Sequence, residues 1–218
     1  MVATGRHLSM LRSYTAADLL TIGNAACGTI AIFFCLDYVA SGRPRFFWTA
    51  FLLLPAALVC DVLDGYVARL NRTRQSRLGA DLDSLADVIS FGVAPAILGF
   101  TLGLRGGWDM LLLTYFVVCG VSRLARFNVT AEALADHDTG KVKYFEGTPI
   151  PTSIVLVMVL GLAFYLDRVG DDIWLGSMRL GPASLHPLSL MYAVSGSAMI
   201  SATLRVPKTG ITTTRSRA

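Results

Sequence analysis

Two pairs of aspartates are the residues with the clearest capacity for chemistry. Asp61 and Asp64 stand three residues apart near the end of a long apolar stretch, and Asp83 and Asp87 stand four residues apart at the start of another. These spacings place each pair on one face of an α-helix. A charged side chain deep in a bilayer costs roughly 2.5–3.5 kcal/mol on insertion scales. Something must therefore offset the cost of placing four carboxylates in apolar segments.

Four carboxylates that meet in one pocket predict a site for metal ions. Two helices joined by a short turn would run antiparallel and bring the acidic faces together. Carboxylates that share a site must be protonated or neutralised by cations, and an all-oxygen donor set selects Mg²⁺, Mn²⁺ or Ca²⁺. Two such ions would balance four carboxylates and form the metal pair that promotes displacement at phosphorus. A single aspartate here could be structural, but this phasing favours a metal site.

Small and polar residues beside the aspartates fit a phosphate-bearing substrate. Gly65 follows the first pair and Gly79 precedes the second pair by one turn. At both positions the missing side chain would let a bulky substrate approach the backbone. Arg69 and Ser76 could bind a phosphate from the rim of the pocket.

The elements that must position these residues are long apolar stretches. Of the 218 residues 54% are hydrophobic and 16% charged, which is too apolar for an ordinary soluble domain. A helix needs about 20 apolar residues to cross a hydrocarbon core. Six stretches qualify: residues 18–39, 47–66, 84–104, 108–127, 150–167 and 187–204. We expect an all-α integral membrane protein with an interfacial segment over 1–17, one six-helix domain over 18–206 and a disordered basic tail over 207–218.

The distribution of basic residues predicts that both termini lie in the cytoplasm. With the N-terminus inside, fourteen of the nineteen Lys and Arg residues fall in inside segments, as the positive-inside rule requires. The aspartates then lie at the cytoplasmic side of the membrane, which we expect to be the plasma membrane of a prokaryote. Loops lying on anionic headgroups account for the net charge of +4 without a nucleic-acid partner.

The aspartates and their neighbours resemble the signature of a known family, the CDP-alcohol phosphotransferases. The pattern is D-x2-D-G-x2-A-R followed by G-x3-D-x3-D. Its positions are filled by Asp61, Asp64, Gly65, Ala68, Arg69, Gly79, Asp83 and Asp87. The loop inside the pattern is one residue longer than the family's commonest spacing. The six apolar stretches extend the resemblance over most of the chain.

The resemblance implies that a hydroxyl attacks the β-phosphorus of a CDP-linked substrate and displaces CMP. It implies that the four aspartates bind two divalent cations and that Asp87 is also the general base. The residues implied to contact the CDP group are Asn24, Gly65, Ala68, Arg69, Ser76 and Gly79. For Asn24, a polar contact between packed helices stays equally open. Members of the family are usually homodimers, so we expect a homodimer.

Three further stretches resemble the members of that family that use serine. They are DSLADVISFGVAPA at 83–96, SRLARFNV at 122–129 and KYFEGTPIPTS at 143–153. The likeness implies that CDP-diacylglycerol, among the lipids of the membrane, donates its phosphatidyl group to L-serine. Arg126 and Lys143 could bind the carboxylate of serine, and Asn128 or Glu146 its ammonium group.

Residue chemistry alone leaves the acceptor open. The same basic residues would suit glycerol 3-phosphate or inositol phosphate, and the donor could be an ether-linked CDP-lipid. A different class of function, a divalent-cation carrier, would need acidic residues along a path through the membrane. Here the acidic residues gather at one end of the apolar stretches, which disfavours transport.

Overall fold

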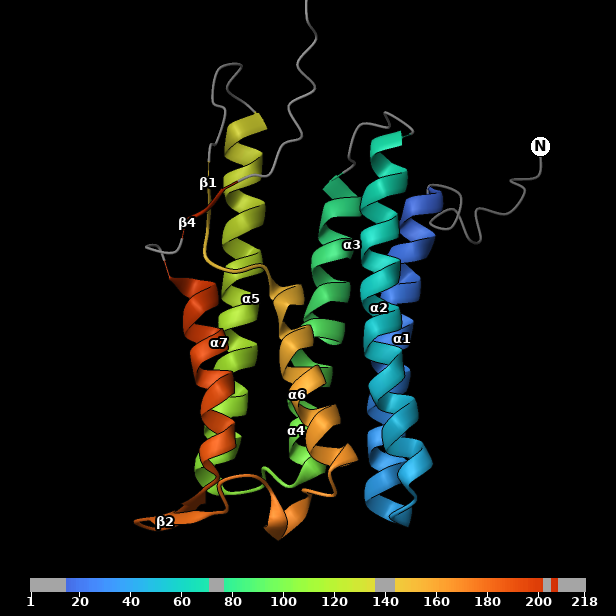
Figure 1. The fold of residues 1–218 in the computed structure, drawn as a ribbon. Coiled ribbons are helices and arrows are strands. Elements are labelled where there is room, and N and C mark those ends of the chain that lie inside the picture. Colours follow the sequence, from blue (N-terminus) through green and yellow to red (C-terminus); the bar gives the residue numbers. More distant parts are fainter. Residues whose placement is uncertain (1–14, 71–76, 136–143, 202–204, 208–218) are drawn as a thin grey trace, which may run out of the picture.

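The protein, described by a computed structural model over residues 15–70, 77–135, 144–201 and 205–207, is a bundle of helices with roughly aligned axes (Figure 1). The α-helices are α1 (Ala16–Ser41), α2 (Pro44–Leu70), α3 (Arg77–Asp87), α4 (Ala94–Leu102), α5 (Gly107–Ala135), α6 (Ile154–Tyr165) and α7 (Leu190–Ile200). Short 3-10 turns precede or connect some of them, at Ile150–Ser153 (η3), Gly170–Asp172 (η4) and Pro187–Ser189 (η5). The predicted helical membrane architecture is confirmed in this coarse form.

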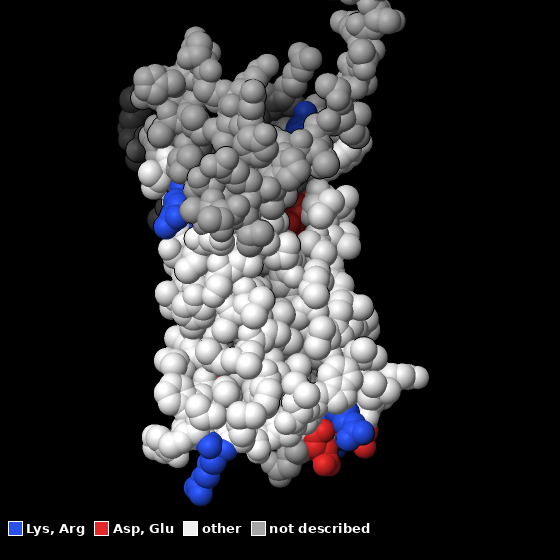
Figure 2. Space-filling model, turned by 60° about the vertical axis from the view of Figure 1, so that its left-hand side comes forward, with Lys and Arg blue, Asp and Glu red and all other residues white. Residues whose placement is uncertain are grey.

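Four helical stretches are long and apolar enough to cross a membrane. They are Ala16–Ser41, Pro44–Leu70, Leu78–Leu102 and Gly107–Val129. The last two predicted spans correspond to shorter apolar helices, Ile150–Tyr165 and Pro187–Ile200. Figure 2 shows a face on which the charged side chains among the described residues lie toward the two ends, with a wide uncharged band between them. This band is what a hydrocarbon core requires.

The prediction of an all-α fold was incomplete, because the described residues also form two small antiparallel sheets. Strand β1 (Tyr144–Glu146) pairs with β4 (Arg205–Pro207), and β2 (Met178–Leu180) pairs with β3 (Ala183–Leu185). Strands of three residues are too short to leave a readable alternation in the sequence. Most of the predicted tail, from residue 208 onward, lies outside the described residues.

Local signals in the sequence account for the start and end of α1. Thr15 and Asp18 form a capping box, in which Asp18 N donates to Thr15 Oγ1 at 3.3 Å and Thr15 N donates to Asp18 Oδ2 at 2.7 Å. The helix therefore starts inside the predicted interfacial segment, of which residues 1–14 lie outside the described part. At the other end Gly42 adopts φ 65°, a left-handed cap that glycine tolerates. Pro44 then begins α2, which packs along α1.

A π-helical segment, η2 (Val88–Val93), joins α3 to α4 and lies in the centre of the bundle. Two-thirds (67%) of the apolar window within Leu78–Leu102 is buried, against 22–28% for the other three long stretches. Helix α1 approaches η2 closely, because a Cβ placed on Gly28 would lie 2.8 Å from the Cα of Ser90. Such π-helical segments occur frequently at functional sites, and this one follows Asp87 directly.

Candidate active site

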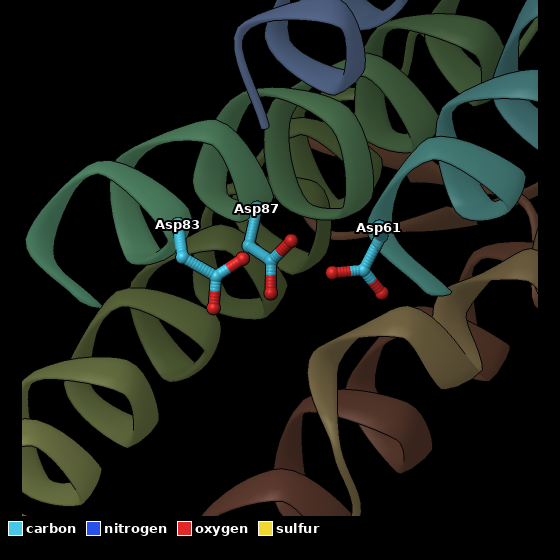
Figure 3. A group of neighbouring side chains, drawn as sticks. All are labelled: Asp61, Asp83 and Asp87. Atoms are coloured by element: carbon cyan, nitrogen blue, oxygen red, sulfur yellow. The ribbon is translucent and has the colours of Figure 1, made fainter. Parts of the chain in front are cut away.

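Three of the four predicted aspartates form one group. Asp61 comes from the second half of α2, and Asp83 and Asp87 come from successive turns of α3. Their carboxylates turn toward a common space (Figure 3), and each contributes an oxygen to a set whose members all lie within 4.8 Å of one another. Asp87 is buried, while Asp61 and Asp83 are half-buried. The prediction from helical spacing that Asp61 lies close to Asp83 and Asp87 is thus confirmed.

Asp64 is held differently from the other three. Its carboxylate is buried on the face of α2 that meets α1, where Oδ2 accepts a hydrogen bond of 2.7 Å from Thr21 Oγ1. It is not part of the group of three described above. Its role as a metal ligand stays a prediction. Thr21 was not singled out from the sequence, although its spacing of three residues from Asn24 places both on one face of α1.

The donor set of this group fits a divalent cation. Asp83 Oδ1 is buried and has no hydrogen-bond partner among the described residues. Buried polar atoms are almost always paired, so such an atom beside two further carboxylates calls for a cation or a proton. Carboxylate oxygens are the ligands that Mg²⁺, Mn²⁺ and Ca²⁺ prefer. Asp61, Asp83 and Asp87 are therefore suited to hold one or more such ions.

Asn24 contacts the acidic group directly from α1. Its Nδ2 donates to Asp87 Oδ1 at 3.2 Å, and its backbone carbonyl accepts a bond of 2.8 Å from Ser90 Oγ. The side chain is fully buried, and its Oδ1 has no hydrogen-bond partner within the part of the chain that the structure describes. Asn24 thus orients Asp87 and leaves one oxygen free near the site. Ser90, which fixes this part of α1, was missed because its contact depends on the close approach at Gly28.

The other residues expected to contact the CDP group lie on α2 and α3. Gly65 and Ala68 are half-buried and Arg69 is exposed. A Cβ on Gly65 would touch only the guanidinium of Arg69, at 3.8 Å. Gly79 is half-buried in the first turn of α3, and Ser76 lies outside the described residues. Their roles stay predictions.

The residues expected to bind the acceptor do not form one group among the described side chains. Asn128 exchanges two hydrogen bonds with Ser84, of 3.0 and 3.2 Å, which join α5 to α3 beside Asp83. Arg126 is exposed on α5. Lys143 lies outside the described residues, and of Glu146 only the backbone in β1 is described. The roles predicted for these four residues remain untested.

Comparison with known proteins identifies the class of this site. The family model described as CDP-alcohol phosphatidyltransferase matches residues 14–202. The chain therefore belongs to the CDP-alcohol phosphatidyltransferase family, and the resemblance seen in its aspartate pattern is confirmed. Membership of a family of transferases also argues against the cation-carrier hypothesis.

The relatives it resembles carry names that refer to serine. CDP-diacylglycerol–serine O-phosphatidyltransferase of Saccharomyces cerevisiae is 43% identical over 206 residues, or 93% of this chain and 74% of the relative. The Helicobacter pylori (strain ATCC 700392 / 26695) protein of the same name is 38% identical over 148 residues, 67% of this chain and 56% of the relative. Archaetidylserine synthase of Methanothermobacter thermautotrophicus is 38% identical over 177 residues, 80% of this chain and 68% of the relative. The chain thus spans between about half and three-quarters of their lengths.

Proposed function

We propose that the protein is a phosphatidylserine synthase, which transfers the phosphatidyl group of CDP-diacylglycerol to the hydroxyl of L-serine and releases CMP. The observation that carries this proposal is the 43% identity, over 93% of the chain, to the yeast enzyme of that name. The acidic group at the junction of α2 and α3 supports it, because displacement at a diphosphate needs its negative charge to be neutralised.

The proposed mechanism assigns the metal ions and the proton to different parts of the site. Divalent cations held by Asp61, Asp83 and Asp87, with Asp64 as a further expected ligand, would neutralise the diphosphate and the departing CMP. Asp87 takes the proton of the serine hydroxyl as that oxygen bonds to the β-phosphorus and the bond to CMP breaks. The amide of Asn24 donates to Asp87 Oδ1, so Oδ2 is the atom that receives the proton.

We further propose that residues 18–206 form one domain of six spans with both termini in the cytoplasm. The excess of basic residues in the inside segments supports this orientation, since it places the aspartates at the cytoplasmic surface. Bacterial relatives support a prokaryotic plasma membrane, although the yeast relative shows that the likeness extends to a eukaryote. The homodimer also remains a proposal, and chemical cross-linking in native membranes would test it.

A second donor lipid should be tested, because the archaeal relative is named an archaetidylserine synthase. Its name and those of the other relatives agree on serine and differ in the lipid group. The comparison of donors therefore keeps serine as the acceptor and varies the lipid. An ether-linked CDP-lipid is the alternative donor to compare with CDP-diacylglycerol.

Release of CMP by the purified protein tests the proposal. With Mg²⁺ or Mn²⁺ and CDP-diacylglycerol, we expect CMP to appear when L-serine is added and not when glycerol 3-phosphate or inositol phosphate replaces it. Equal release with glycerol 3-phosphate would contradict the acceptor assignment while leaving the phosphotransfer chemistry intact. Faster release from the ether-linked donor would reassign the lipid only.

A further inference from the structure

Arg123 is a charged residue within the apolar stretch of α5 that the sequence did not single out for substrate binding. Its side chain is half-buried. On α5 it lies between Gly120, which meets η2 through Ile150, and Asn128, which bonds Ser84 of α3, so this part of α5 runs beside Asp87. Its guanidinium carbon lies over the ring of Phe127, at a loose 5.8 Å from the ring centroid. Within the described residues its guanidinium takes part in no ion pair and no hydrogen bond. A half-buried cation without such partners is unusual, because desolvation is normally compensated by pairing.

The surroundings of Arg123 contain further polar groups without partners. The segment before α6 docks through Ile150, whose Cδ1 would lie 2.7 Å from a Cβ on Gly120 of α5 and 3.8 Å from one on Gly92 of η2. Arg123 follows Gly120 by three residues, so both lie toward one side of α5. In the docked segment Thr148 Oγ1 and Ser153 Oγ are buried and bond to none of the described residues. Helix α5 and the segment docked on it thus offer three polar side chains that are not used within the described residues.

The charge of Arg123 selects the chemical class of its ligand. The neighbouring aspartates attract cations, whereas a guanidinium presents a planar fork of N–H groups that fits a carboxylate or a phosphate. In the proposed reaction the diphosphate of the donor is neutralised at the aspartates. The carboxylate of the acceptor is then the anion that still lacks a partner. Arg126, the earlier candidate, is exposed, whereas Arg123 is half-buried.

Accepting the proposed function, we infer that Arg123 binds the carboxylate of serine and thereby turns the serine hydroxyl toward Asp87. It makes the enzyme select an amino acid over an amino alcohol of similar size. A site built to bond a polar group rejects an analogue that lacks it, because its own donors are then left unpaired. Ethanolamine, which has the hydroxyl and ammonium groups of serine but no carboxylate, is the matching analogue.

Steady-state kinetics of Arg123→Gln and Arg123→Lys test this inference. For Arg123→Gln we expect the KM for serine to rise about 10- to 150-fold, the range for loss of a charged hydrogen bond. The KM for CDP-diacylglycerol should stay at its wild-type value, which also shows that the variant is folded, and the variant should discriminate less between serine and ethanolamine. Arg123→Lys should recover part of the loss. Arg45→Gln, at the far end of α2, is the control and should behave as wild type.

The outcomes separate this inference from the proposed function. If the wild-type protein released CMP at the same rate without serine, the proposed function would be overturned. The inference about Arg123 would then be overturned as well, before any variant is measured. Serine-dependent wild type with an unchanged serine KM in Arg123→Gln would overturn the inference alone. So would an equal rise in both KM values, which would assign Arg123 to the donor, or a selective rise in Arg126→Gln instead.

Discussion

Asp109 and Asp83 are both carboxylates in apolar helices, at opposite ends of the bundle, yet their surroundings differ in kind. Asp109 lies in the first turn of α5 and is fully buried. Its Oδ2 accepts 2.8 Å from Gly106 N and lies 2.5 Å from His186 Nδ1, and its Oδ1 accepts 2.8 Å from His186 N. Asp83 Oδ1, in contrast, is buried beside two other carboxylates and has no hydrogen-bond partner in the described parts of the chain.

The difference separates a carboxylate that fastens the fold from carboxylates kept for a ligand. Asp109 ties the start of α5 to the segment that leads into α7, 77 residues later in the chain, and has its oxygens satisfied by the protein itself. The aspartates of α2 and α3 repel one another, which destabilises the folded protein until a cation binds between them. Burial alone therefore does not identify a functional carboxylate. A buried carboxylate oxygen without a hydrogen-bond partner does.

The largest expected effect is that of Asp87→Asn on turnover. The amide keeps the shape of the side chain but cannot take the serine proton, so CMP release should fall about 10²- to 10⁴-fold. Binding of CDP-diacylglycerol, measured separately, should largely survive because the other aspartates remain. Wild-type rates in this variant would remove Asp87 from the mechanism.

Exchanging the two kinds of carboxylate for amides should give opposite results. Asp109→Asn leaves His186 and Gly106 with a poorer acceptor and should lower the free energy of unfolding by about 2–4 kcal/mol, with CMP release per folded molecule unchanged. Asp83→Asn removes a mutual repulsion, so without metal its stability should equal or exceed that of wild type while turnover is lost. Thermal unfolding measures the stability of both variants, and CMP release measures their turnover.

Added Mg²⁺ makes the same contrast visible without an activity assay. Saturation at 100 times Kd should stabilise wild type and Asp109→Asn by about 2.7 kcal/mol, and Asp83→Asn by much less. Equal stabilisation of all three proteins would show that the ion binds elsewhere.

A smaller effect is expected where α1 approaches η2. A Cβ in Gly28→Ala would press on the backbone of Ser90, push α1 away and stretch the contact between Asn24 and Asp87. We expect a loss of about 1–3 kcal/mol in stability and a fall in turnover at unchanged KM for serine. Gly23→Ala is the matched control, because its Cβ would meet only Cys60 Sγ at an ordinary 3.7 Å. Equal behaviour of the two variants would contradict the role of this close approach.

The sequence predicted what depends on regular periodicity and missed what depends on irregular or distant contacts. Apolar length located the helices, and the helical repeat placed Asp61 beside Asp83 and Asp87. The π-helical segment was not foreseen because a helical reading assumes a uniform 3.6-residue turn. His186, which bonds Asp109, and Thr21, which bonds Asp64, lie 77 and 43 residues away from these aspartates, and no spacing rule reaches that far. Arg123 was not chosen as an acceptor-binding residue because a basic residue near a membrane surface has an ordinary topological explanation.

The smallest expected effect decides between two roles for Asn128. If its reciprocal hydrogen bonds with Ser84 only join α5 to α3, then Asn128→Ala and Ser84→Ala should each cost about 1 kcal/mol of stability, and the double variant little more than either. The KM for serine should then change equally little in both. A role in binding the ammonium group of serine instead requires the KM to rise in Asn128→Ala and to stay unchanged in Ser84→Ala. A coupling energy near zero in the double-mutant cycle, together with that selective rise, would return Asn128 to the acceptor site.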